Sequence, residues 1–341
     1  MKRIRPGLAA LLAVAATAVA ALSGCGGGAK AGAEVTELRY QGSVGQVTLP
    51  ELAADLGYLG NVKLKWIGNT ISGPQDIQAA TTGDTDFGGA FNGAIVKLAA
   101  AKAPIKAVIG YYGSDKISNM GFYVLNDSPI KTARDLIGKK IGVNTLGAHS
   151  EAITKTYLAR NGLTDAEIKQ VELVVVPPVN TEQSLRQGQI DVAALGGTLR
   201  DKAIERGGIR TLFTDYDLLG AFTAGSYVFR DDFLKKNPAT VRTFVTGVGK
   251  AIEWTRTQPR ETVIARFQDI IRKRARNEDA SLVTYWKSYG VADKGGVITD
   301  TEFSTWIDWL TRAGELKGKQ VTAQDVYTNQ YNDYRPGGGL Q

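Results

Sequence analysis

The stretches Gly121-Phe-Tyr-Val-Leu125 and Ser226-Tyr-Val-Phe229 decide the architecture that we expect for this chain of 341 residues. Both are short and rich in the aromatic and β-branched residues that favour strands. They bracket a series of alternating strand-like and helix-like segments, and a similar series precedes the first stretch. If the two stretches pair, the chain crosses twice between two αβ lobes, and a pair of crossings forms a hinge beside a cleft.

The residues before Gly121 alternate between β-rich runs and helical patterns. This order predicts an α/β fold with a mainly parallel sheet covered by helices. The capping-box pattern Ser72-Gly-Pro-Gln75 marks one of the helix starts. The expected strands are 35–40, 62–67, 86–89 and 105–112, and the expected helices are 49–58, 72–80 and 94–101.

The second series runs from residue 132 to residue 213, and the chain after residue 233 is helical almost throughout. Trp306, Trp309 and Leu310 stand at the i, i+3, i+4 spacing of a helix face that packs into a core. The second series is expected to contain strands 140–143, 171–176, 190–195 and 210–213 and helices 132–137, 150–161, 181–187 and 199–206. The C-terminal region is expected to contain helices 239–257, 260–273, 280–288 and 303–313.

The N-terminus has the layout of a secretory signal, with three basic residues, an apolar run from residue 8 to residue 22 and small residues before a cut. Leu22-Ser-Gly-Cys25 resembles the lipobox of bacterial lipoproteins, whose cysteine is acylated. We therefore expect a signal peptide at 1–24, a lipid-anchored spacer at 25–34 and a position on the outer face of the cell membrane. A plain secretory signal and a short membrane helix are the alternatives, but the apolar run is shorter than the ~20 residues of a spanning helix.

Composition excludes several classes of protein. The net charge of +7 falls to +4 once the three basic residues of the signal are removed, which is too small to indicate nucleic-acid binding. The basic run at 272–276 is expected to be a solvated helix face. One cysteine and one histidine offer no zinc spacing and no intramolecular disulfide, so we expect neither a metal nor a cofactor.

Three loops, 41–47, 88–93 and 144–150, follow expected strands and open helices. Ligands of open parallel sheets bind at this edge, where helix N-termini present unpaired N–H groups. The loops are rich in glycine and contain no Lys, Arg, Asp or Glu. A small anion held by N–H groups and hydroxyls fits them, although the same glycines also suit plain turns. Their polar candidates are Ser43, Gln46, Asn92, His149 and Ser150.

Signs of catalysis are weak. His149 is the only histidine, and Ser150 beside it on a helix start has poor geometry for a nucleophile and its base. The chain contains neither a G-x-S-x-G elbow nor a G-x-G-x-x-G loop after its first strand. We therefore do not expect an enzyme.

Several segments together resemble the solute-binding proteins of ABC importers, in particular the nitrate, sulfonate and taurine group (SsuA/TauA-like). No single motif is specific, but the segments follow one another in the order of that group over roughly residues 38–332. They are the run Ala79–Gly88 ending in Gly-Asp-Thr-Asp-Phe-Gly, Ala103–Lys106, Ser128–Ile130 with Asp135–Val143, Ala148-His149, Ala159–Leu163 and Leu185–Val192.

The resemblance implies a two-lobed periplasmic-binding-protein fold of the second type, with a hinge of two crossing strands and a helical C-terminal region. Lobe 1 would comprise 35–120 plus 226–341, and lobe 2 would comprise 121–225. A monomer would capture a small anion of the aliphatic sulfonate, taurine or nitrate class between the lobes and present it to ABC permease subunits. Carried over by position, the site adds Phe91, Gly147, Gly197, Thr198 and Thr223 to the loop candidates.

Two departures put sulfonate and taurine in question. Gly196-Gly197-Thr198 stands where many members of the group have an aromatic residue, and Leu146-Gly147 stands where sulfonate binders often have two small hydroxyl residues. Two other functions stay open. One is an enzyme like the thiamine-pyrimidine synthases, which resemble this group but carry a cysteine-rich segment. The other is a ligand sensor for a membrane receptor.

Overall fold

The computed structural model describes residues 33–340, and from Glu34 onward the chain forms one compact unit. The expected signal peptide, most of the expected spacer and Cys25 lie outside the described residues. Glu34 itself contacts the folded body, because its carboxylate accepts hydrogen bonds from the backbone N–H groups of Ala239 and Thr240 at a helix start. No described helix is both long enough and apolar enough to cross a membrane.

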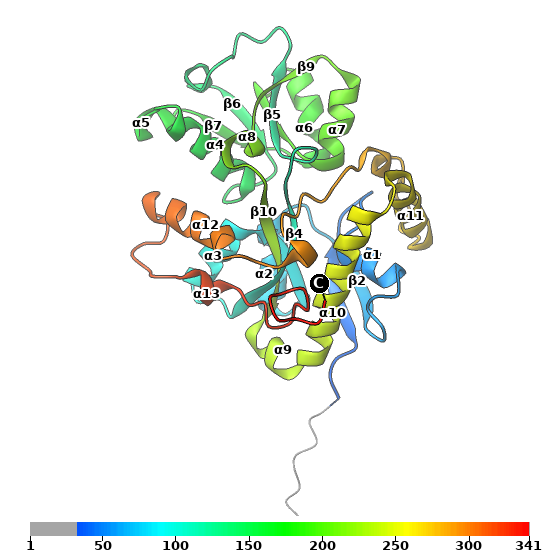
Figure 1. The fold of residues 1–341 in the computed structure, drawn as a ribbon. Coiled ribbons are helices and arrows are strands. Elements are labelled where there is room, and N and C mark those ends of the chain that lie inside the picture. Colours follow the sequence, from blue (N-terminus) through cyan, green and yellow to red (C-terminus); the bar gives the residue numbers. More distant parts are fainter. Residues whose placement is uncertain (1–32, 341) are drawn as a thin grey trace, which may run out of the picture. The chain divides into compact units, whose positions relative to one another are not determined.

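The lower part of Figure 1 holds two small sheets. Strands β1 (Glu37–Gly42) and β2 (Lys63–Asn69) pair in parallel, as expected. In the second sheet β10 (Phe222–Arg230) lies antiparallel between β3 (Phe87–Phe91) and β4 (Ile105–Ser114). The expectation of a mainly parallel arrangement was therefore wrong for this sheet, because a strand from a distant part of the sequence is inserted. The helices of this part are α1 (Leu49–Asp55), α2 (Gly73–Thr82), α3 (Asn92–Ala100), α9 (Asp231–Lys236), α10 (Pro238–Thr257), α11 (Arg260–Lys273), α12 (Thr301–Arg312) and α13 (Ala323–Val326).

The upper part is built on a five-stranded sheet in the order β7-β6-β8-β5-β9. Strands β6 (Lys140–Val143), β7 (Glu172–Val175) and β8 (Val192–Leu195) are parallel, whereas β5 (Gly121–Leu125) runs antiparallel to β8 and β9 (Ile209–Thr214). Its helices are α4 (His149–Arg160), α5 (Asp165–Ile168), α6 (Pro178–Arg186), α7 (Gly197–Arg206) and α8 (Asp215–Leu219). The α/β class is thus confirmed.

The pairing of Gly121–Leu125 with Ser226–Phe229 that we considered as a condition for the two crossings does not occur. Each stretch uses both of its edges within its own sheet, since β5 lies between β8 and β9 and β10 lies between β3 and β4. No backbone donors or acceptors are then left for pairing the two strands with each other. The chain crosses between the two parts at 115–120 and 215–221. The lobe limits stay a prediction, with the refinement that β10 already begins at Phe222.

The helix starts and one expected helix differ in part from the local sequence patterns. Thr48 forms the full capping box of α1 with Glu51, but Ser72 makes no side-chain cap at α2, so the capping box expected there is absent. The expected helix at 280–288 was also wrong. It is replaced by a short 3-10 turn, η2 (Leu282–Tyr285), and an extended segment up to residue 290, because the polar groups of this segment bond to other elements and not along a helix. The buried Trp306 and Leu310 confirm the core face of α12.

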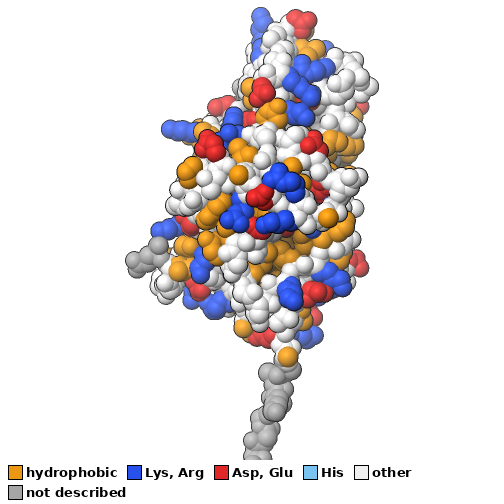
Figure 2. All heavy atoms as spheres, turned by 90° about the vertical axis from the view of Figure 1, so that its right-hand side faces the viewer, with side chains coloured by type: hydrophobic (Ala, Val, Ile, Leu, Met, Phe, Trp, Pro, Cys, Tyr) orange, Lys and Arg blue, Asp and Glu red, His pale blue; other side chains and the backbone are white. Residues whose placement is uncertain are grey.

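The basic run after α11 is not a uniform solvated face. Arg272 and Lys273 are exposed, but the side chains of Arg274 and Arg276 are only 8% and 10% exposed and both pair with the buried Glu51 of α1. Elsewhere positive and negative side chains are interspersed, as Figure 2 shows for one face. The expectation therefore fails for the two arginines that anchor the end of α11 to α1.

Candidate functional site

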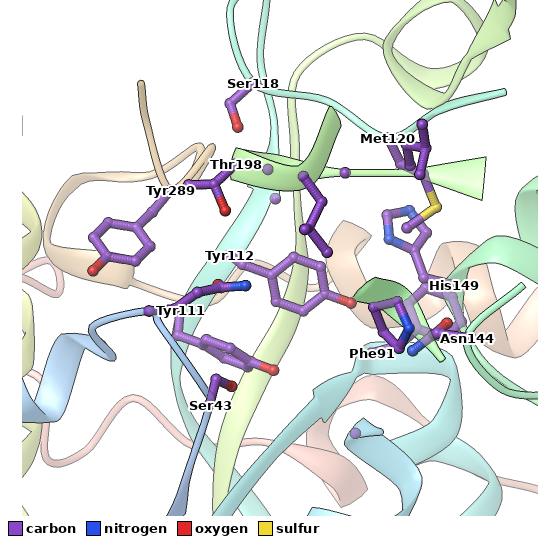
Figure 3. Close-up of a pocket in the computed structure, with 18 of the residues that line it drawn as sticks. Ser43, Phe91, Tyr111, Tyr112, Ser118, Met120, Asn144, His149, Thr198 and Tyr289 are labelled. Carbon is purple, nitrogen blue, oxygen red and sulfur yellow. The ribbon is translucent and has the colours of Figure 1, made fainter. Parts of the chain in front are cut away.

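A cavity of about 420 Å³ lies between the two parts of the fold, and residues of both line it (Figure 3). It is formed by the loops that follow β1, β3, β6 and β8, by the end of β4, by the first crossing and by the extended segment after η2. The loops are those at the carboxyl ends of strands, where open sheets bind ligands. The cavity lies within the range of about 300–1,000 Å³ that is typical of small-molecule pockets.

The loop between β1 and α1 is fixed by a buried arginine. Arg274 donates to the backbone carbonyl of Gln46, and its guanidinium also pairs with Glu278 and Glu51. Glu278 in turn accepts a hydrogen bond from the N–H of Gly45. These bonds engage the backbone of the loop, while the side chains of Ser43 and Gln46 remain at the cavity wall.

The two crossings are joined by one buried carboxylate, that of Asp215 at the start of α8, which is 1% exposed. Its Oδ1 accepts hydrogen bonds from the Ser114 hydroxyl (2.8 Å) and from the Met120 N–H (3.0 Å). Its backbone N–H donates to the carbonyl of Met120 (2.9 Å). Asp215 therefore ties the beginning of the second crossing to both ends of the first.

His149 connects this carboxylate to the cavity wall. Its Nε2 lies 3.2 Å from Oδ2 of Asp215, but neither atom is aligned for a hydrogen bond. The imidazole stacks on the Phe91 ring with centroids 5.2 Å apart and planes 7° apart.

Aromatic rings line the side of the cavity that belongs to the lower part of the fold, and we call this side the aromatic wall. Tyr111 stacks on Tyr227 at 4.2 Å between centroids and meets Tyr112 edge-on at 4.9 Å. Burial raises the pKa of these three phenols and of Tyr289, so that all four stay protonated at neutral pH. The hydroxyl of Tyr289 donates to the carbonyl of Val47, which fixes the extended segment against the β1–α1 loop.

Two helices open toward the cavity without a side-chain cap. The N-cap residues are Ala148 for α4 and Gly196 for α7, and neither provides a side-chain acceptor. Both residues and the two that follow each of them line the cavity. Uncapped N–H groups carry about half a positive charge at each helix N-terminus. The site can therefore attract an anion although its lining residues include no Lys or Arg.

Asp76 is a second buried carboxylate near the aromatic wall. One oxygen accepts a hydrogen bond from the N–H of Gly89 at 2.7 Å, and the other has no partner among the described residues. Burial raises the pKa of Asp76 to about 7, and burial likewise raises that of Glu302 in α12 to about 7. No cluster of three metal-ligating side chains occurs in the part of the chain that the structure describes.

Seven of the ten expected site residues line the cavity, and three lie elsewhere. The fully buried Asn92 side chain donates to the carbonyl of Thr223 and accepts from the Ser226 hydroxyl. Thr223 is also fully buried and accepts from the N–H of Ala292. Gly147 turns the chain before α4 with φ +70° and donates to Glu151. The seven at the cavity are Ser43, Gln46, Phe91, His149, Ser150, Gly197 and Thr198.

Sequence reasoning missed the aromatic wall and Asp215. The pair Tyr111-Tyr112 at the carboxyl end of a strand is a signal that could have been used, because that edge binds ligands. Asp215 could have been noticed as the first residue of a helix after a strand. The extended segment with Trp286 and Tyr289 had no usable signal, since its pattern suggested a helix.

Comparison with known proteins places the chain in a family. The model of the family described as NMT1/THI5 like matches residues 53–262. The chain belongs to the NMT1/THI5-like family. A relative in Brucella abortus (strain 2308), whose name gives it only as a binding protein, is 27% identical over 264 residues, covering 75% of this chain and 73% of the relative.

Solved structures similar to this NMT1/THI5-like protein share its fold. The periplasmic aliphatic sulphonate binding protein SsuA from Escherichia coli has a TM-score of 0.64 and 22% identity, covering 86% of this chain and 93% of that one. The periplasmic nitrate-binding protein NrtA from Synechocystis PCC 6803 has a TM-score of 0.68 and 15% identity, covering 87% of each chain. The desulfurization enzyme DSZB has a TM-score of 0.57 and 14% identity, covering 87% and 97%. The periplasmic-binding-protein fold is therefore confirmed, and it also occurs in an enzyme.

Replacing Asp215 with alanine should lower the free energy of unfolding by about 2–4 kcal/mol, because buried hydrogen bonds to a charged acceptor contribute about 1.5–3 kcal/mol each and their donors lose their partner. Asp215→Asn keeps an acceptor at this position and should cost less. Urea unfolding would measure both variants. Asp308→Asn is the control, since Asp308 is an exposed residue of α12. Equal losses in Asp215→Ala and Asp308→Asn would contradict the assigned role.

The raised pKa values of Asp76 and Glu302 make stability depend on pH. A carboxyl whose pKa is higher in the folded than in the unfolded state stabilises the fold below about pH 4, and this contribution is lost as the pH rises toward 7. In the wild type, the unfolding free energy should therefore decrease as the pH rises from 4.5 to 7, by at most about 1.4 kcal/mol per pH unit for one such group. Asp76→Asn should make this decrease smaller. Urea unfolding at several pH values would measure the slope, and an unchanged slope would show that Asp76 is ionised throughout.

Proposed function

We propose that this protein is the extracytoplasmic substrate-binding component of an ABC importer and captures a small anion in the cavity between its lobes. The observation that carries the proposal is the cavity itself. It is lined from both lobes, it adjoins the two crossings, and two uncapped helices open into it. A ligand that contacts both lobes at once stabilises their closed arrangement, which is the form that permease subunits would recognise.

The binding groups favour an anion bound without a cationic side chain. N–H groups at the starts of α4 and α7 and hydroxyls such as those of Ser43 and Thr198 are hydrogen-bond donors. Sulfonate, taurine and nitrate, the class that the family resemblance implies, all have acceptor oxygens that suit such donors. The size of the cavity favours an organic sulfonate over nitrate, because a three-oxygen ion would leave most of the space unfilled.

Conversion of the ligand is the less favoured alternative. Ser150 donates its hydroxyl to the sulfur of Met120 at 3.3 Å and not to His149, so the two residues do not form a nucleophile–base pair. The single cysteine, Cys25, belongs to the expected lipobox. A sensor for a membrane receptor would use the same cleft, and reconstitution with the permease and ATPase would distinguish it from an importer subunit by measuring ligand-dependent ATP hydrolysis.

The N-terminal sequence supports attachment to the outer face of the membrane through a lipid on Cys25. Cys25→Ser should release the protein from the membrane fraction into the soluble extracytoplasmic fraction. Cells grown with labelled palmitate should label the wild type and not the variant. Label retained in Cys25→Ser would contradict the lipobox.

Ligand binding is testable by thermal unfolding of the purified protein with alkanesulfonates, taurine, nitrate and matched neutral amides. A specific ligand at a hundred times its Kd adds about 2.7 kcal/mol of stability. Gly196→Trp should abolish this shift. A Cβ at Gly196 would have only the Met120 methyl group, at 4.0 Å, near it, and φ is −137°, so the indole can enter the cavity without straining the backbone.

The matched control is Gly339→Trp, which introduces the same side chain at a site with no neighbour within 4 Å of the new Cβ and outside the cavity lining. It should leave the ligand-induced shift unchanged. Full binding by Gly196→Trp would show that the ligand does not occupy this cavity. Stabilisation by neutral amides alone would remove the anion from the proposal and keep the binding role.

A further inference from the structure

The side chains around the cavity are distributed unequally between the two lobes. One wall consists of aromatic rings from β4, β10, the β3–α3 junction, α11 and the extended segment after η2. Figure 3 shows Tyr111 and Tyr112 beside each other, with Tyr289 on the same wall. The rings that line the cavity are those of Phe91, Tyr111, Tyr112, Tyr227, Phe267, Trp286 and Tyr289.

The opposite wall contains two adjacent glycines where β8 meets α7, flanked by the lining residues Leu195 and Thr198. Gly196 and Gly197 follow Ala194-Leu195 there, and a Cβ on Gly197 would meet no atom within 4 Å. We call the part of the cavity between the aromatic wall and this glycine pair the slot. A slot with rings on one side accommodates a flat group, since aromatic rings prefer stacked or edge-to-face partners.

Tyr112 is held in position by its own contacts. A Cβ at Gly225 of β10 would come within 2.0 Å of Cε1 of Tyr112, so the ring lies directly over this glycine and could not do so over a larger residue. The hydroxyls of Tyr111 and Tyr112 make no hydrogen bond within the described residues, although each phenol remains protonated. Both can donate to an acceptor on a ligand that lies against the rings.

We propose that the ligand is an aromatic anion, with one or two fused rings in the slot between Tyr112 and the Gly196-Gly197 backbone. Its carboxylate or sulfonate group lies at the N-termini of α4 and α7. This inference rests on the proposed binding function and deepens it by specifying the body of the ligand. Aliphatic sulfonates of similar size fill the same volume but lack the flat face that the wall of rings favours.

The test compares ring anions with their saturated counterparts by isothermal titration calorimetry. The pairs are benzenesulfonate with cyclohexanesulfonate and benzoate with cyclohexanecarboxylate. Naphthalene-2-sulfonate extends the series to two rings, and benzenesulfonamide is the neutral control. We expect at least one ring anion to bind about tenfold more tightly than its saturated partner, which corresponds to a ring preference of about 1.4 kcal/mol.

A pair of variants assigns the preference to the aromatic wall. Tyr112→Leu should weaken the ring anion about tenfold and change the saturated anion less than threefold. Tyr112→Phe keeps the ring and should retain most of the preference. A general loss of structure in Tyr112→Leu would weaken both ligands equally, so the difference between the two ligands is the decisive readout.

The outcomes separate this inference from the binding function on which it rests. Saturated or aliphatic anions that bind as tightly as ring anions would overturn the aromatic ligand and leave the importer subunit intact. Benzenesulfonamide binding as tightly as benzenesulfonate would overturn the anionic group in both proposals. No binding by any anion of the series at millimolar concentration would overturn the aromatic ligand. The importer function would be overturned only if alkanesulfonates, taurine and nitrate also left thermal unfolding unchanged.

Discussion

The buried carboxylate of Asp215 is the interaction on which the arrangement of the site depends. It accepts from Ser114 at the end of β4 and from Met120 before β5, so it fixes the point where the chain leaves one lobe and the point where it enters the other. It also lies 3.2 Å from His149 at the start of α4. The two crossings therefore share a single acceptor beside the start of α4, and the low dielectric of the interior makes its loss costly.

A second set of contacts closes one side of the cavity through the segment after η2. Lys287 pairs with Asp201 of α7 at 3.1 Å, and Ser288 donates to Asp115 of the first crossing. Two residues after Lys287, the hydroxyl of Tyr289 donates a hydrogen bond to the carbonyl of Val47 in the β1–α1 loop. This segment belongs by sequence to the C-terminal helical region, yet it contacts the upper lobe. Movement of the lobes would have to break or carry these bonds, which links the aromatic wall to any opening of the cleft.

The proposed function requires the site to select an anion without a cationic side chain. Helix N-termini and neutral phenols provide oriented donors, and their partial charges attract an anion less strongly than a desolvated arginine would. A protein that must release its ligand to a permease benefits from binding that depends on simultaneous contact with both lobes. In the proposed function, the donors of either lobe alone would hold the ligand only weakly once the lobes separate.

Sequence patterns located most of the strands and helices, because periodicity and capping residues act over a few neighbouring positions. The parallel pairs of β1 with β2 and of β6 with β7 followed from the alternation of elements. The order of the lower sheet did not follow, because β10 is inserted from over a hundred residues beyond β4, and long-range pairing leaves no local signal. The same limit explains the missed extended segment, whose helical pattern is overridden by bonds to other elements.

Some residues of the candidate site follow from local sequence patterns, whereas the positions of others depend on contacts between distant segments. Local sequence patterns located the loops at the carboxyl ends of the strands, and these loops bring Ser43, Gln46 and His149 to the cavity wall. The burial of the Asn92 side chain in the core and of Arg274 against Glu51 could be seen only in the tertiary structure. The same holds for Asp215 and the tyrosines, which the tertiary structure brings to the same cavity. The physical reason is that a side chain's burial and partners depend on segments distant in sequence, whereas the turn that exposes a helix N-terminus is encoded in adjacent residues.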